Sequence, residues 1–187
     1  MIIYLHDYRS PWPRYLKFKP HQNATDVEHI VVSKVMSMDQ VVEAVIRKAA
    51  KPKSIWLLLL LAHGNQGYLE LGTGLTKDTC HHFHDLREFM TPGGEGIEIH
   101  GCAVASNSPI ADYPFLPHNE RLKHLKGTAE SSRTAGVNML KALARAGNCI
   151  VKGAIDAQWV DRDGKYNGHY VVVKPTGTFE IRSGCPT

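Results

Sequence analysis

The chain has 187 residues, 43% of them hydrophobic and 21% charged, and its formal net charge is +4 at pH 7. This length suits one domain with a substantial core, so we expect a single domain over residues 1–187. The mild charge, with no Lys and Arg cluster interleaved with aromatic residues, argues against nucleic-acid binding. No apolar run is long enough to span a bilayer, and the N-terminus lacks a signal-peptide pattern. We expect no nucleic-acid or membrane partner, and a protein that is cytoplasmic or exported without a recognisable signal peptide.

Strand and helix patterns alternate along the first hundred residues. Ser37 is followed three residues later by Gln40, a capping box that predicts the start of a helix. Residues 55–62 are apolar at every position, which is typical of an interior strand of a parallel sheet. Residues 9–25 contain three prolines and indicate a loop. The expected elements are strands at 2–5, 29–33, 55–62 and 97–100, a hairpin arm at 68–71, and helices from Ser37 to Pro52 and over 76–90.

The second half of the chain continues the alternation after a long segment at 107–132, which is rich in Pro, Asn, His and Lys. So long a loop in a compact domain is usually functional or disordered. A helix is expected over 134–146, and a strand from Cys149 toward Asp156. Turn signals at 163–164 and 175–177 predict an antiparallel tail. Together these patterns predict an α/β sandwich with a mainly parallel sheet and a short antiparallel C-terminal extension.

His63 and Cys102 each follow one of the expected strands. The carboxyl ends of parallel strands meet at one edge of a sheet, and neighbouring strands lie about 4.8 Å apart. If these two strands are neighbours, an imidazole and a thiol share that edge. The imidazole can take the thiol proton and so produce a reactive thiolate. The pair therefore indicates a cysteine nucleophile beside its base.

Glycines flank both residues: Gly64 follows His63, and Gly101 precedes Cys102. Glycine allows the backbone to turn sharply and to approach a substrate carbonyl closely. The backbone N–H groups of Gly64 and Cys102 could then stabilise an oxyanion, an effect worth about 3 kcal/mol per donor.

These residues resemble the caspase-like cysteine peptidases, the clan of caspases, metacaspases, separases, gingipains and toxin self-processing domains. The similarity lies in a hydrophobic strand ending in His63-Gly64 and a second ending in Gly101-Cys102. Residues 63–72 and 99–106 are especially similar to an uncharacterised bacterial caspase-like domain often found in large surface proteins. The close resemblance covers residues 55–106, and the strand order extends it loosely to about residue 156.

The resemblance implies a three-layer caspase-like sandwich and a cysteine endopeptidase with His63 and Cys102 as catalytic residues. The substrate would be a protein or peptide. No cofactor and no metal are expected, although some relatives need calcium or another small activator. The caspase pentapeptide around the cysteine is absent, because the chain reads His100-Gly101-Cys102-Ala103-Val104, so caspase-type specificity for aspartate is not implied.

Two carboxylates are candidates for a substrate pocket on the same edge. Asp7 ends the first expected strand, and Asp156 ends the strand after the long helix. A carboxylate there would select Lys or Arg at the scissile position through a charge-assisted hydrogen bond, whereas Arg9 keeps a preference for acidic residues open. The long segment corresponds to the region that many relatives cleave. If the substrate pocket is acidic, its basic residues would be self-cleavage sites: Arg121, Lys123 and Lys126.

Other interpretations stay open. His100 lies on the same side of its strand as Cys102, so it could tune the thiol, replace His63 as base, or simply fill the sheet face. Non-catalytic use of the fold as an interaction module is one alternative, and an acyl transferase or esterase with the same dyad is another. A metal-binding protein using Cys80, His81 and His84 is a third. The four cysteines, which include Cys149 and Cys185, show no C-x-x-C pair, and free thiols are expected. The oligomeric state stays open.

Overall fold

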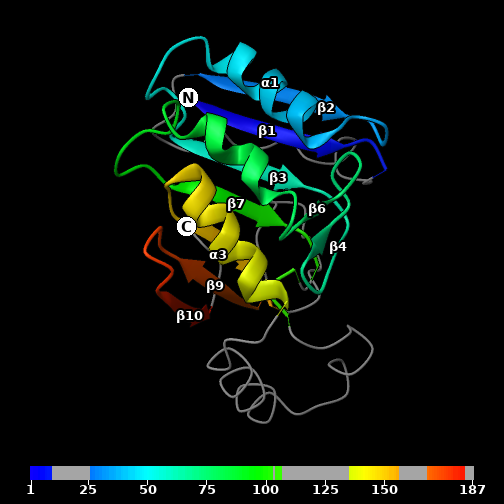
Figure 1. Ribbon diagram of the computed structural model, residues 1–187, viewed down its shortest axis with the longest axis vertical. Coiled ribbons are helices and arrows are strands. Elements are labelled where there is room, and N and C mark those ends of the chain that lie inside the picture. Colours follow the sequence, from blue (N-terminus) through cyan, green and yellow to red (C-terminus); the bar gives the residue numbers. More distant parts are fainter. Residues whose placement is uncertain (10–25, 103, 107–134, 156–167, 184–187) are drawn as a thin grey trace.

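A computed structural model describes residues 1–9, 26–102, 104–106, 135–155 and 168–183. Within these residues, seven strands form one sheet in the order β10-β9-β8-β7-β3-β1-β2 (Figure 1). The five strands from β8 to β2 are parallel to one another, and β9 and β10 add antiparallel pairs at the β8 side. The strands are β1 (Ile2–Asp7), β2 (Val27–Val32), β3 (Leu57–Leu61), β7 (Gly96–His100), β8 (Val151–Ala154), β9 (His169–Val173) and β10 (Phe179–Ser183). The expected mainly parallel sheet with an antiparallel C-terminal extension is therefore confirmed.

The helices that the structure describes lie on one face of this sheet (Figure 1). They are α1 (Met38–Ala49), the 3₁₀ helix η2 (Cys80–Leu86) and α3 (Ala135–Gly147). Their buried side chains join those of Ile3, Leu58, Leu60, Ile97 and Ile99 in the main hydrophobic core. The α/β sandwich is confirmed in this form, whereas a third layer is not formed by the described residues. No helix within the described ranges is long and apolar enough to cross a membrane.

The opposite face of the sheet has a smaller core. Its apolar members are Ile2, Tyr4, Leu57, Leu59 and Leu61, all of them buried. Because β3 contributes to both cores, every one of its side chains is buried, which explains why this strand is apolar at every position. The same face also carries buried polar groups: His6, Glu98, His100 and Lys152.

Helix α1 begins as its capping box predicts. The Gln40 amide donates to Ser37 Oγ at 3.3 Å, and the Ser37 amide donates to Gln40 Oε1 at 3.0 Å. These two bonds satisfy backbone donors that a helix start leaves without intrahelical partners. Helix α3 likewise buries the expected Val137, Leu140 and Leu143.

The helix expected over 76–90 is wrong in type and extent. Strand β6 occupies Leu75–Thr76, and the short helix η2 covers Cys80–Leu86. The buried residues of η2 are Cys80, Phe83 and Leu86, which are spaced by three. In a 3₁₀ helix, side chains three residues apart lie one above the other, so this spacing fits the tighter helix. The segment at 107–132, the turn at 163–164 and residues 10–25 of the loop expected at 9–25 lie outside the described residues.

A second, three-stranded antiparallel sheet follows His63. It consists of β4 (Gly64–Asn65), β5 (Tyr68–Leu69) and β6, in that order. The hairpin expected at 68–71 beside His63 is thereby confirmed. In Figure 1 this small sheet lies beside the carboxyl ends of β3 and β7.

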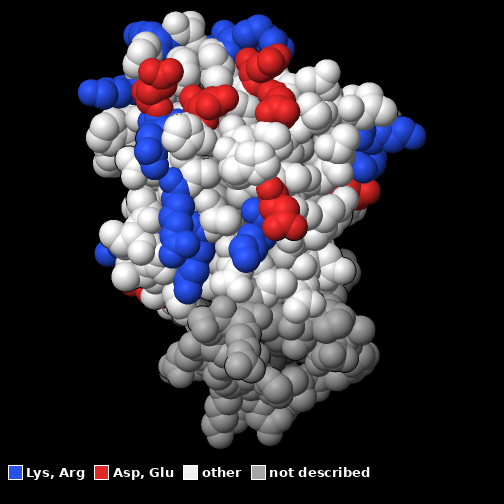
Figure 2. Space-filling view, in the orientation of Figure 1, with Lys and Arg blue, Asp and Glu red and all other residues white. Residues whose placement is uncertain are grey.

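Charge on the helix-covered face is mixed. Figure 2 shows a narrow column of basic side chains with acidic side chains beside and above it, separated by wide uncharged areas. The described part of this face therefore carries both signs of charge, in keeping with the mild net charge of the sequence.

Candidate active site

His63 and Cys102 follow neighbouring parallel strands, as expected. The last register pair of β3 with β7 is Leu61 with His100, and each candidate stands two residues beyond its member of that pair. The His63 side chain is exposed, and the Cys102 side chain is partly exposed and forms no disulfide. Imidazole and thiol therefore belong to two loops that leave the sheet side by side at the same edge.

The two loops are in close backbone contact at their glycines. A Cβ atom on Gly64 would stand 2.8 Å from the Cys102 carbonyl oxygen and 2.5 Å from Val104 Cγ1. A Cβ on Gly101 would stand 2.5 Å from Leu69 Cδ1. Real Cβ atoms do not make contacts this short without a shift of the neighbours. Glycine at both positions is thus what lets the His63 loop and the Cys102 loop pack against each other.

Three backbone hydrogen bonds hold this edge together. The Glu70 amide donates to the His63 carbonyl at 2.7 Å, which closes the β4–β5 hairpin onto His63. At the tip of the hairpin, the Gly67 amide donates to the Val104 carbonyl at 3.1 Å. The loop after Cys102 is in turn fastened to the end of β8, because the Ala105 amide donates to the Ala154 carbonyl at 2.8 Å.

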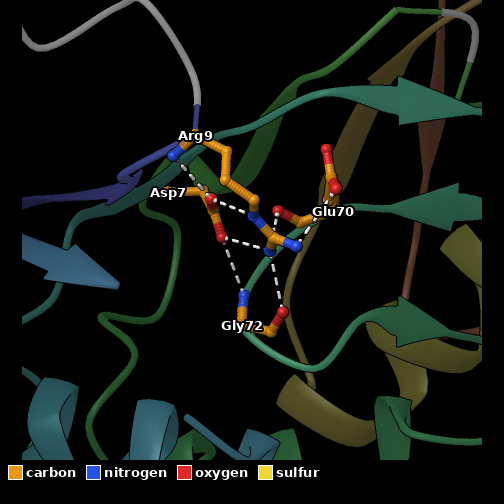
Figure 3. Close-up of polar contacts among 4 residues, drawn as sticks. All are labelled: Asp7, Arg9, Glu70 and Gly72. Carbon is orange, nitrogen blue, oxygen red and sulfur yellow. Dashed lines mark hydrogen bonds and ion pairs between the residues drawn. The ribbon is translucent and has the colours of Figure 1, made fainter. Parts of the chain in front are cut away.

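Asp7, the predicted substrate-binding carboxylate, is buried at the end of β1 and has partners within the protein (Figure 3). Arg9 donates from Nε to Asp7 Oδ1 and from Nη2 to Oδ2, both at 2.7 Å. The Gly72 amide donates to Oδ2 at 2.9 Å. Burial by itself would raise the pKa of Asp7, but the hydrogen bonds and charge of Arg9 and the Gly72 amide lower it below 3.8.

Arg9 also binds the segment that follows the hairpin. Its Nη2 donates to the carbonyl oxygens of Glu70 and Gly72 at 3.0 and 2.8 Å, and Nη1 donates to Glu70 Oε1 at 3.0 Å. The interaction with Asp7 raises the pKa of Arg9, which is charged in any case. Sequence reasoning placed Asp7 at this edge but missed the contacts of Arg9 with Glu70 and Gly72, because these residues are 61 and 63 positions from Arg9. The only local signal was an arginine two residues after the aspartate.

The second predicted carboxylate, Asp156, lies outside the described residues. His100, the alternative base, is buried on the sheet face with the smaller core, and its Nε2 lies 3.1 Å from Glu98 Oε1. His100 thus has a carboxylate of its own strand as a polar partner.

The residues of the metal-binding alternative do not converge. Cys80 is buried and its thiol donates to the Met139 carbonyl on α3 at 3.5 Å, whereas His81 and His84 are exposed. Burial raises the pKa of Cys80 to about 12, which opposes the thiolate form that metals bind. Within the described part of the chain, no three His, Cys, Asp or Glu side chains are arranged to hold a metal ion.

No family model matches the chain, and neither the curated proteins nor the solved structures include a match to it. The function must therefore be inferred from the residues of this edge and their arrangement.

Proposed function

We propose that this protein is a caspase-like cysteine endopeptidase in which His63 and Cys102 form the catalytic dyad. The observation that carries the proposal is the parallel pairing of β3 with β7, whose following loops bring an exposed imidazole and an accessible thiol to one edge. A nucleophile and a base at the carboxyl ends of adjacent strands are a common arrangement for acyl transfer. The resemblance of residues 55–106 to the caspase-like peptidases supports the same assignment.

The dyad would act in two steps. His63 accepts the thiol proton of Cys102, and the resulting thiolate attacks the scissile carbonyl carbon. The C–N bond then breaks while His63 returns the proton to the leaving amine, which leaves a thioester on Cys102. In the second step His63 takes a proton from water, the hydroxide attacks the thioester, and the carboxylic acid product leaves as the thiol is restored.

Backbone amides supply the oxyanion site in this mechanism. The ladder bonds of an antiparallel pair alternate in direction. Because Glu70 bonds to His63 in the β4–β5 ladder, the amide of the next residue, Gly64, points away from β5. In the proposed mechanism this amide and the amide of Cys102 donate to the substrate oxygen. Each such donor is worth about 3 kcal/mol in the transition state.

The preference for a basic residue at the scissile position stays a prediction. Asp7 already has Arg9 as a partner, so a substrate Lys or Arg would have to replace Arg9 to reach this carboxylate. Self-cleavage between residues 107 and 132 is tested by incubating the purified protein beside Cys102→Ala and comparing fragments by mass spectrometry. Identical fragments from both proteins would count against self-cleavage.

Thiol labelling and peptide cleavage together test the dyad. At neutral pH, an iodoacetamide probe should alkylate Cys102 faster than Cys149, because burial raises the pKa of the Cys149 thiol to about 12. Cys102→Ala and His63→Ala should each abolish cleavage of a peptide library, whereas Cys149→Ala, the matched control, should retain it.

Each alternative has its own outcome in this experiment. A folded wild-type protein that cleaves nothing and alkylates Cys102 no faster than Cys149 would favour a non-catalytic interaction module. Turnover of ester or thioester substrates without peptide cleavage would favour an acyl transferase or esterase with the same dyad.

A further inference from the structure

We propose that Asp7 and Arg9 form a clamp that positions His63, acting through Glu70. This inference rests on the proposed function, because it concerns the base of the proposed dyad. The clamp consists of the carboxylate of Asp7 at the end of β1 and the guanidinium of Arg9, which reaches across to residues 70–72 (Figure 3).

The clamp joins two segments that are distant in the sequence. Arg9 uses its guanidinium fork on both oxygens of Asp7, and the same group bonds the carbonyls of Glu70 and Gly72. Asp7 accepts the Gly72 amide as well. Segment 70–72 is thus held by the Gly72 amide, which donates to Asp7, and by two carbonyl oxygens, which accept from Arg9. A shift of its backbone would break these charge-assisted hydrogen bonds.

Segment 70–72 in turn holds His63. The last register pair of β3 with β7 is Leu61–His100, so His63 lies beyond the part of the ladder that fixes the strand. Its carbonyl instead accepts the Glu70 amide at 2.7 Å. Glu70 therefore binds His63 on one side and Arg9 on the other, with both its carbonyl and its carboxylate facing the guanidinium.

Only an arginine side chain can make all of these contacts from position 9. A planar guanidinium can bond a carboxylate with two parallel hydrogen bonds and reach further acceptors at fixed angles, whereas an ammonium or amide cannot make the whole set. The Arg9 side chain is three-quarters buried, 24% of it being exposed, so its contacts are partly shielded from water. Arg9 and Asp7 are positioning residues in this proposal, because they act on the base through Glu70.

A pair of variants separates positioning from stability. Arg9→Gln leaves the Asp7 carboxylate buried without its cation, and this should destabilise the fold. The double variant Asp7→Asn/Arg9→Gln removes the buried charge, so its melting temperature should return toward that of the wild type. Both variants lose the guanidinium hydrogen bonds to Glu70 and Gly72. In both, kcat should fall about tenfold or more, with KM little changed. Arg47→Gln, which removes an exposed arginine paired with Glu43, is the matched control and should leave kcat unchanged.

Amide hydrogen exchange provides a readout that does not depend on activity. The Glu70 amide should exchange faster in both clamp variants than in the wild type or Arg47→Gln. Recovery of kcat together with stability in the double variant would overturn the proposal, as would unchanged exchange at Glu70. If wild-type protein shows no activity that Cys102→Ala removes, the proposed function fails. In that case, faster exchange at Glu70 would still show that the clamp holds the His63 loop, without a role in catalysis. If Arg9→Gln does not fold, kcat and Glu70 amide exchange are compared between the double variant and the wild type.

Discussion

Gly64 lies so close to Cys102 that a Cβ atom at position 64 would stand 2.8 Å from the Cys102 carbonyl oxygen. Gly64→Ala should therefore push the His63 loop and the Cys102 loop apart. We expect a loss of about 1–3 kcal/mol in the free energy of unfolding, as for other overpacked sites. Cleavage should fall further than stability explains, since the same shift separates imidazole from thiol. Urea denaturation and peptide turnover measure the two effects. Lys77→Ala, an exposed change in the same region, is the control, and wild-type values for Gly64→Ala would refute the close contact.

Asp7 should make the protein sensitive to strong acid. Its pKa is lowered in the folded state, so its contribution to stability is present above the unfolded value of 3.8 and is lost as the pH falls through the folded value. Asp7→Asn should reduce stability by about 2 kcal/mol at neutral pH, because Arg9 loses its charged acceptor. Denaturation measured from neutral pH to about pH 2 should show a shallower acid loss in the variant. Parallel curves for the two proteins would contradict this account.

Protonation of His6 should cause a separate loss of stability at milder acidity. Burial, and then the neighbouring His29, lower the pKa of His6 from 6.5 to about 4. Its Nε2 lies 2.8 Å from His29 Nδ1, and the two rings stack. Between these pH values the unfolded chain binds a proton that the folded protein does not, so stability decreases as the pH falls from 6.5 to about 4.

His6→Gln should flatten that part of the stability curve and leave the loss at lower pH in place. Chemical denaturation at half-unit pH steps is the measurement, with the exposed His84→Gln as the control. If both histidine variants behave alike, His6 is not the group responsible.

Cys80 should behave as a core residue. Its thiol packs under α3 and bonds the Met139 carbonyl, so Cys80→Ala should cost about 1–2 kcal/mol of stability. The wild-type melting temperature should not respond to a chelator, and elemental analysis should detect no stoichiometric zinc. A melting temperature that falls with chelator and is restored by zinc would instead support the metal-binding alternative.

The central part of the fold could be predicted from the sequence because its signals are local. An apolar run covers every position of β3, a capping box begins α1, and a His-Gly and a Gly-Cys pair each follow a strand. Parallel strands that alternate with helices then bring His63 and Cys102 to one edge, and this much of the site follows from order and pattern alone.

The partners of the polar residues could not be predicted in the same way. Nothing local to Asp7 indicates that its carboxylate binds an amide at Gly72, 65 positions later. The extent of η2 was missed for a different reason: apolar residues at 83, 86, 89 and 90 fit an α-helix, but the buried set Cys80, Phe83 and Leu86 follows a period of three. Tertiary packing determines both the partners of Asp7 and the type of helix at η2. The periodicity of apolar residues in the sequence does not contain that information.

The sequence distance across the clamp has a consequence for folding. Closing a loop of 65 residues costs chain entropy, so we expect Asp7 and Gly72 to meet only after β1 has paired with β3. A partly folded chain would then carry the Cys102 thiol before its base is held in place. We expect peptide turnover to return later than the far-ultraviolet signal of the sheet during refolding from urea. Simultaneous recovery would mean that the His63 and Cys102 loops are already in place when the first strands pair. A nascent chain would then carry an activated thiol before the rest of the sheet has formed.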